Sequence, residues 1–230
     1  MNRSLTCLVP ILLVNPVFAE EKKEKHHEDP TKIVTKLGIG YNGDATFSGS
    51  IGLDEARMLN GRVNHDGSEW SVGGSWLFDI GILNFYFGRN TYDDDSHNTS
   101  YSVGTFIPLS YFGFTPGGWQ IFATGGYSYN DGEVRDEFDP IAGDYVFRPQ
   151  SSHGGYLGAF AFKPLTEHWS VMTFGGAGLG SDDYSNYWIG GGVSYKINDH
   201  HSLNTFAMYS DSSIYDSDSK LGVNYKYEFK

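Results

Sequence analysis

The sequence predicts an all-β protein, a transmembrane, antiparallel, up-and-down β-barrel of twelve strands, with ten strands as the alternative. Three observations support this fold class. Aromatic residues make up 16% of the chain and glycine supplies 30 of its 230 residues, while the mean hydropathy is −0.38, a composition typical of strands and turns. After residue 19 no apolar run reaches the ~20 residues that a spanning helix needs. Instead, apolar residues alternate with polar or small ones, as in the strands of a membrane barrel.

The first nineteen residues are expected to be a cleaved signal peptide. Arg3 supplies a short positive region, a mostly apolar segment runs from Leu5 to Val14, and Val17-Phe18-Ala19 has the small-x-small pattern of a cleavage site. We therefore expect export, with Glu20 as the first residue of the mature chain. An uncleaved anchor is the alternative, but the apolar run is too short to cross a bilayer.

A short linker is predicted between the signal peptide and the barrel. Residues 20–32 are highly charged and lack aromatic side chains, so we expect a disordered, charged periplasmic linker. The neighbouring His26 and His27 are interpreted as part of a solvated tail, because no second set of ligands follows at a fixed spacing. We expect no metal and no cofactor. Residues 33–230 form the predicted barrel.

Period-two alternation defines the strands. In the last segment, for example, Val223, Tyr225 and Tyr227 alternate with Asn224 and Lys226. The second and third segments are the weakest, which is why ten strands is the alternative, and the eighth and ninth are apolar on both faces. The predicted strands are residues 33–42, 45–53, 56–64, 69–79, 82–92, 99–109, 118–130, 154–163, 168–179, 184–197, 201–210 and 218–229.

The connections differ between the two predicted ends of the barrel. If the first strand starts in the periplasm, the longest and most acidic connections face outside, where Arg135 and Arg148 are their only Lys or Arg residues. Short periplasmic turns and longer outer loops are typical of outer-membrane barrels. The predicted outer loops are Asn42–Asp44, Asn64–Ser68, Asp93–Asn98, Asn130–His153, Ser181–Asp183 and Asp211–Ser217.

The sequence resembles bacterial outer-membrane β-barrel proteins as a class. The resemblance covers residues 33–230 and rests on the export signal, the strand pattern and the final strand LGVNYKYEF, which ends at Phe229. In that class such a strand is read by the barrel assembly machinery, so the resemblance implies this partner, although Lys230 follows the Phe. We expect a monomer in the outer membrane, in contact with lipid and lipopolysaccharide. A soluble lipocalin-like barrel or sandwich is the alternative, but the small and polar face would not fill its core.

The inward face of the predicted barrel suggests a lumen. Twelve strands lined by small residues should enclose water-filled space. Arg62 and Glu69 lie near the outer ends of adjacent predicted strands and could pair across it. The charged lumen-lining candidates are Lys36, Arg62, Glu69, Lys196, Lys220, Lys226 and Glu228.

Acidic residues dominate the predicted outer loops. They could bridge to lipopolysaccharide through divalent cations, or simply form a solvated negative surface. The candidates are Asp93, Asp94, Asp95, Asp182 and Asp183. The formal net charge of −12 disfavours nucleic acid as a partner.

These observations predict a small, non-catalytic pore for small solutes. The alternative is a plugged structural or adhesin-like barrel in which Asn130–His153 is the plugging or adhesive loop. A distant alternative is a hydrolase at the rim, built from His65–Asp66, Asp95–His97 or Ser151–Ser152–His153. None of these groups has a distinctive spacing, so we expect no enzyme and no catalytic residue.

Overall fold

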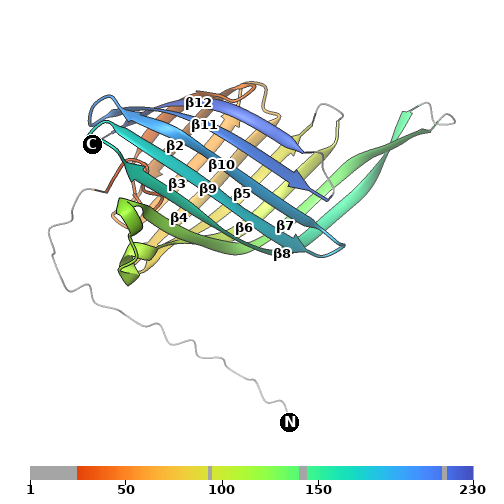
Figure 1. The fold of residues 1–230 in the computed structure, drawn as a ribbon. Helices are drawn as coiled ribbons and strands as arrows, with labels where there is room; N and C mark the ends of the chain where they lie inside the picture. Colours follow the sequence, from red (N-terminus) through yellow and green to blue (C-terminus); the bar gives the residue numbers. More distant parts are fainter. Residues whose placement is uncertain (1–24, 93–94, 140–143, 214–216, 230) are drawn as a thin grey trace, which may run out of the picture.

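The computed structural model describes residues 25–92, 95–139, 144–213 and 217–229, so the predicted signal peptide and its cleavage site lie outside the described residues. Twelve strands form one closed barrel, in which every strand is antiparallel to its neighbours and β1 pairs with both β2 and β12 (Figure 1). The strands are β1 (Lys36–Tyr41), β2 (Ala45–Gly52), β3 (Arg57–Asn64), β4 (Glu69–Phe78), β5 (Gly81–Thr91), β6 (His97–Pro108), β7 (Gln120–Asp139), β8 (Asp144–Pro164), β9 (Trp169–Gly180), β10 (Ser185–Lys196), β11 (His201–Ser212) and β12 (Asp218–Glu228).

The predicted fold and the count of twelve strands are confirmed. The two weakest predicted strands, β2 and β3, pair in register from Thr46↔Asn64 to Gly52↔Met58. Closure pairs every strand of the ring on both sides, which a barrel in lipid requires because nothing in the bilayer core would satisfy exposed backbone groups. Within the described part of the chain, no helix is both long and apolar enough to cross a membrane.

The two ends of the barrel differ in their connections. Lys36 and Glu228 lie at the end that we call the termini end, and the opposite end is the loop end (Figure 1). At the termini end most connections are tight turns, but two 3₁₀ turns, Leu109–Phe112 and Pro116–Gly118, link β6 to β7.

The predicted loop Asn130–His153 is largely strand. β7 and β8 continue beyond the rim as a two-stranded hairpin, with backbone pairing as far as Asp139↔Asp144 (Figure 1). The prediction of a loop was wrong because a hairpin with both faces in water lacks the apolar alternation that marks a strand in lipid. The hairpin projects away from the barrel and therefore does not plug it.

Apolar side chains cover the outside of the cylinder. Leu157, Leu179 and Leu221 are 74–77% exposed, as expected for side chains that contact lipid. The structure also gives the inward face of β8, which the sequence left open: Phe162 is inward and only 2% exposed, whereas Leu157 points out.

Inward glycines make room for large inward side chains. A Cβ atom on Gly190 would meet the ring of Phe174, and one on Gly222 would meet the ring of Phe206. Tyr156 occupies the space beside Gly104 in the same way. Glycine opposite an aromatic residue is a familiar pairing in curved sheets. The glycine-lined lumen is therefore narrower than the sequence suggested.

Candidate functional site in the lumen

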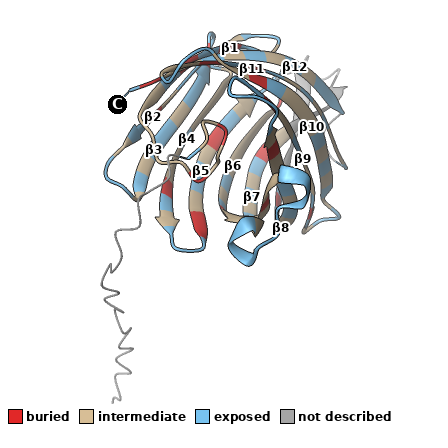
Figure 2. Cartoon of the chain, turned by 60° about the vertical axis from the view of Figure 1, so that its left-hand side comes forward, coloured by how far each residue is buried: buried red, intermediate tan, exposed pale blue. Residues whose placement is uncertain are grey.

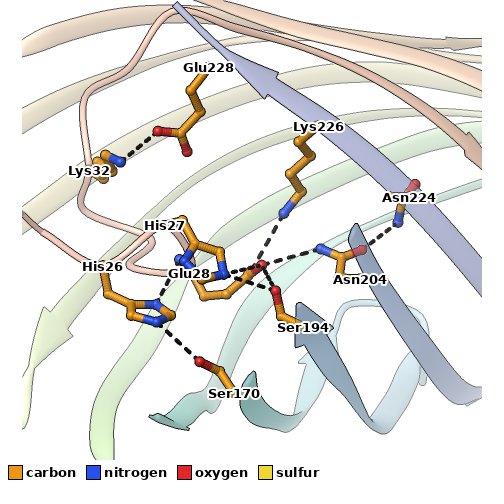
Figure 3. A network of polar contacts seen from close by, with 10 residues as sticks. All are labelled: His26, His27, Glu28, Lys32, Ser170, Ser194, Asn204, Asn224, Lys226 and Glu228. Atoms are coloured by element: carbon orange, nitrogen blue, oxygen red, sulfur yellow. Dashed lines mark hydrogen bonds and ion pairs between the residues drawn. The ribbon is translucent and has the colours of Figure 1, made fainter. Parts of the chain in front are cut away.

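The segment before β1 enters the barrel at the termini end. Glu28 and Thr31 are buried (Figure 2), and His26, His27, Glu28 and Lys32 contact side chains of the inner wall (Figure 3). We call residues 25–32 the N-terminal plug. The prediction of a solvated linker over residues 20–32 is therefore wrong for the part that is described, because barrel residues far along the chain supply partners for its polar groups.

Glu28 is the centre of the contacts between plug and wall (Figure 3). Its Oε1 atom accepts hydrogen bonds from Ser194 Oγ at 2.8 Å and from Asn204 Nδ2 at 3.4 Å. Its Oε2 atom lies 3.5 Å from Lys226 Nζ. Asn224 donates to Asn204 Oδ1 at 3.2 Å and so orients that amide. Strands β10, β11 and β12 thus each supply one group to a single carboxylate.

The two histidines extend the contact to neighbouring strands. His27 Nε2 lies 3.0 Å from Ser194 Oγ, and His26 Nε2 lies 3.1 Å from Ser170 Oγ on β9. The His26 ring also stacks on Phe162 of β8, with 4.7 Å between ring centroids. The N-terminal plug therefore lies against five consecutive strands, β8 to β12. The interpretation of these histidines as a solvated tail is wrong.

Further contacts hold the plug in shape and join it to the wall. Asp29 Oδ1 accepts hydrogen bonds from the backbone N–H and the hydroxyl of Thr31, which forms a local turn. Lys25 Nζ donates to the Thr31 hydroxyl at 2.7 Å. Lys32 Nζ donates to Glu228 Oε2 at 2.6 Å. Most of these contacts are polar or charged, unlike those of an apolar core.

The plug environment changes three pKa values. Burial lowers the pKa of His26, and burial together with the neighbouring His26 lowers that of His27 to about 4. Burial alone would raise the pKa of Glu28, but the Lys226 ammonium and the Ser194 hydroxyl outweigh it, so this pKa lies below its usual value. Docking therefore favours neutral histidines and an ionised Glu28.

A second polar cluster lies nearer the loop end. Arg62 and Glu69 form an ion pair at 3.7 Å, which confirms the pairing proposed from the sequence. Lys220 of β12 reaches the same carboxylate at 2.9 Å, although three strands separate β12 from β4 in the wall. The cluster borders a cavity of about 420 Å³, which Tyr86 and Asn90 also line. Tyr86 also lines a second cavity of about 230 Å³, whose wall combines serine and asparagine side chains with Tyr156 and Trp188.

The remaining charged candidates lie at the termini end. Lys36 faces Glu228 directly in the β1–β12 register. Lys196 ends β10 and pairs with Asp199 in the following turn at 2.7 Å. Two separate charge clusters therefore form: Lys226 and Glu228 contact the plug, whereas Arg62, Glu69 and Lys220 meet nearer the loop end.

The acidic loop candidates that the structure describes lie in connections between strands. Asp95, Asp182 and Asp183 adopt positive φ angles in tight turns, and Asp93 and Asp94 lie outside the described residues. In the described ranges, no three His, Cys, Asp or Glu side chains converge so that they could hold a metal ion.

The groups considered for rim hydrolysis are not brought together as a triad. His65 contacts Asp44 at 3.4 Å. On β8, Ser152 is buried while Ser151 and His153 are exposed on the other face, as the alternation of a strand requires.

Sequence reasoning did not identify Glu28, Ser194 or Asn204 as site residues. A carboxylate in a run of charged residues looks like any solvated acid, and inward serines look like small lumen residues. The available signal was the position of Ser194, Asn204 and Lys226 on the inward face of three successive strands. Such a group marks a polar patch of the wall, but not what binds there.

Comparison with known proteins identifies the fold. No family model matches the sequence, and no curated protein matches it. The structure is similar to the translocator domain of autotransporter NalP from Neisseria meningitidis, at 13% identity over 85% of both chains with a TM-score of 0.57.

The NanC porin is similar at 11% identity over 85% of this chain and 99% of the porin, with a TM-score of 0.52. The fold is that of a bacterial outer-membrane β-barrel. A bacterial polysaccharide outer membrane secretin matches at 12% identity and a TM-score of 0.52, over 83% of this chain and 70% of the other. At such identities the likeness concerns the barrel itself.

Proposed function

We propose that this protein is a non-catalytic pore for small solutes in the bacterial outer membrane, closed at its termini end by the N-terminal plug. The observation that carries the proposal is that the plug contributes no strand to the wall. Every strand of the ring is paired on both sides without it, so the barrel does not need the plug in order to close. Two cavities toward the loop end leave room for water and solute.

The chemistry of the plug contacts also supports a plug that can leave. Hydrogen bonds and ion pairs to Ser194, Asn204 and Lys226 can be exchanged for water, because each partner is hydrated when released. An apolar plug would instead expose hydrophobic surface on release.

The plug is also the observation that favours the second candidate function, a permanently closed structural or surface-interaction barrel. In that role the projecting β7–β8 hairpin would be the contact surface. The two functions differ in one measurable property, the conductance of the barrel once the plug is displaced.

Conductance in planar bilayers tests the proposal. Glu28→Lys places a cation against Lys226 and should release the plug, so we expect larger and more frequent conductance steps than in wild type. Asp79→Lys, at the exposed turn between β4 and β5 at the same end, makes the same charge change away from the plug and is the matched control. If neither Glu28→Lys nor a variant that lacks residues 20–32 conducts, the closed structural barrel is the correct function.

We also propose that the protein is a monomer that contacts lipopolysaccharide, with divalent cations as bridges to its acidic loops, and that the assembly machinery recognises β12. Phe229 follows this strand and is exposed. Phe229→Ala should therefore lower the amount of barrel in the outer membrane, measured against signal-peptide cleavage as a control for export.

A further inference from the structure

We infer that the pocket around Glu28 is a carboxylate-binding site of the pore, which the N-terminal plug occupies in the closed barrel and an anionic solute occupies in the open one. This inference rests on the proposed pore function and names the chemistry of its solute. Glu28 is the observed occupant, so the structure itself shows what kind of group the pocket accepts.

The pocket has the donors that a carboxylate needs. A hydroxyl and a side-chain amide both point at one oxygen, Oε1, and an ammonium group approaches the other. Ser194 and Asn204 lie opposite each other in the β10–β11 register, and Asn224 of β12 donates a hydrogen bond to Asn204, so strands of the wall hold these donors independently of the plug. Hydrogen bonds to a charged group are stronger than those between neutral groups.

Release of the plug would leave one cation of the wall, Lys226, without its carboxylate partner, and this favours the binding of an anion. Release of the plug removes Lys32 from Glu228, but Lys36 faces Glu228 directly in the β1–β12 register. Lys196 already has Asp199 as its partner. Lys226 is then the cation that loses its carboxylate, and an incoming anion would restore this interaction. A neutral solute would leave Lys226 unpaired, which gives the site its selectivity.

The position of the pocket makes it a control point. Glu28 reaches it only when residues 25–32 lie inside the lumen at the termini end. Plug and solute would therefore compete for the same donors, and a solute with a carboxylate would favour the open state. A solute shifts the equilibrium between the closed and the open barrel only to the extent that it binds one of them more tightly than the other.

Chemical rescue of Glu28→Ala tests the site in the full-length mature protein. This variant loses the γ-methylene and the carboxylate of Glu28, both of which propionate carries, and propionamide is the uncharged match. By calorimetry in detergent, we expect propionate to bind Glu28→Ala at least about tenfold more tightly than it binds wild type, with no such gain for propionamide. Lys226→Gln in the Glu28→Ala background should abolish the gain.

A variant that lacks residues 20–32 provides a second test. Its folding is checked by its migration on gels before and after heating. We expect propionate, but not propionamide, to reduce its single-channel current reversibly. Equal binding of the two probes, or binding that survives Lys226→Gln, would overturn the carboxylate site even if the barrel conducts. Propionate binding in a barrel that never conducts would instead refute the pore and leave the site standing.

Discussion

The Glu28 carboxylate and the Lys226 ammonium group lie 3.5 Å apart inside the barrel, although 198 positions separate them in the sequence. Glu28 is at the start of the described chain and Lys226 is in its last strand, β12. The pocket for the plug is therefore incomplete until β12 is in place. The side chain of Glu28 is only 7% exposed, so loss of its partner should cost more than loss of a surface ion pair.

Replacing Lys226 by Met should loosen the plug, because Glu28 then remains buried without its cation. We expect docking to weaken by roughly 1–3 kcal/mol, less than for a fully buried pair, because Lys226 is partly open to the lumen. Trypsin should then cleave the variant after Lys32 roughly tenfold faster than wild type, since the released segment is accessible. Lys163→Met removes a cation from the outward face of β8 and is the control. Unchanged cleavage would mean that Lys226 does not hold the plug.

Acidification should release the plug. The pKa of His26 is lowered and that of His27 falls to about 4, from a usual value of 6.5, so both are more easily protonated in the released segment than in the docked one. The stability that neutral histidines give to docking is present above pH 6.5 and is lost as the pH falls toward 4. Glu28 acts in the same direction below its usual pKa of 4.5.

The pH dependence can be followed by the rate of proteolysis or by conductance between pH 7 and pH 4. Besides each other, the histidines face charged groups on the plug and the wall: Glu28, Asp29, Lys32, Lys196, Lys226 and Glu228. These groups remain in the double variant His26→Gln/His27→Gln, which should lose most of the change above pH 4.5. His65→Gln, at the loop end, should keep it. Tighter docking in acid would contradict the prediction.

Neutralising Glu69 should make an open pore more selective for anions. Glu69 is the shared partner of Arg62 and Lys220, so Glu69→Gln removes one negative charge from the lumen and leaves Arg62 beside Lys220, whose remaining acid is Asp218 at 3.4 Å. The reversal potential across a salt gradient should shift toward the anion value by several millivolts or more, and the shift should shrink as salt screens the charges. Asp131→Asn neutralises an exposed acid beyond this cluster and should change the potential little. A shift toward cations would show that Arg62 and Lys220 do not face the ion path.

The strands could be predicted from the sequence because lipid imposes a strict rule on each of them. Residues such as Leu157 and Leu221 must be apolar on the outside, so the period-two pattern survives even in short strands. The β7–β8 hairpin beyond Asn130 was not predicted, because no lipid surrounds it and its residues therefore need not alternate between apolar and polar. The inward face of β8 was ambiguous because Phe160 and Phe162 are as apolar as the lipid-facing residues.

The plug could not be predicted because its partners are set by the closed barrel and not by neighbouring residues. His26, His27 and Glu28 meet Ser170, Ser194 and Asn204 only after the strands have taken their order. The ion pair of Arg62 with Glu69 could be predicted from the sequence, because β3 and β4 are adjacent strands. The contact of Lys220 with Glu69 could not be predicted, since it depends on the width of the lumen.

A final prediction concerns the glycines of the wall, which differ in what surrounds them. A Cβ atom on Gly192 would lie against the backbone carbonyl oxygen of Thr205 on the neighbouring strand. A backbone atom cannot move away by changing rotamer, so Gly192→Ala must push β10 and β11 apart. We expect a loss of about 1–3 kcal/mol in the free energy of unfolding. On Gly222 the same atom would meet the ring of Phe206, which can rotate, so Gly222→Ala should cost less and displace that ring within the lumen.

Gly74→Ala is the matched control, because its Cβ atom would be 3.7 Å from the nearest neighbours, which is an ordinary contact. Urea unfolding in lipid vesicles, followed by tryptophan fluorescence, gives the three free energies under one condition. We expect the loss to be largest for Gly192→Ala, smaller for Gly222→Ala and close to zero for Gly74→Ala. If all three variants lost the same stability, the cost would come from the strand conformation of alanine itself. The close approach of β10 to β11 would then not be what requires glycine at position 192.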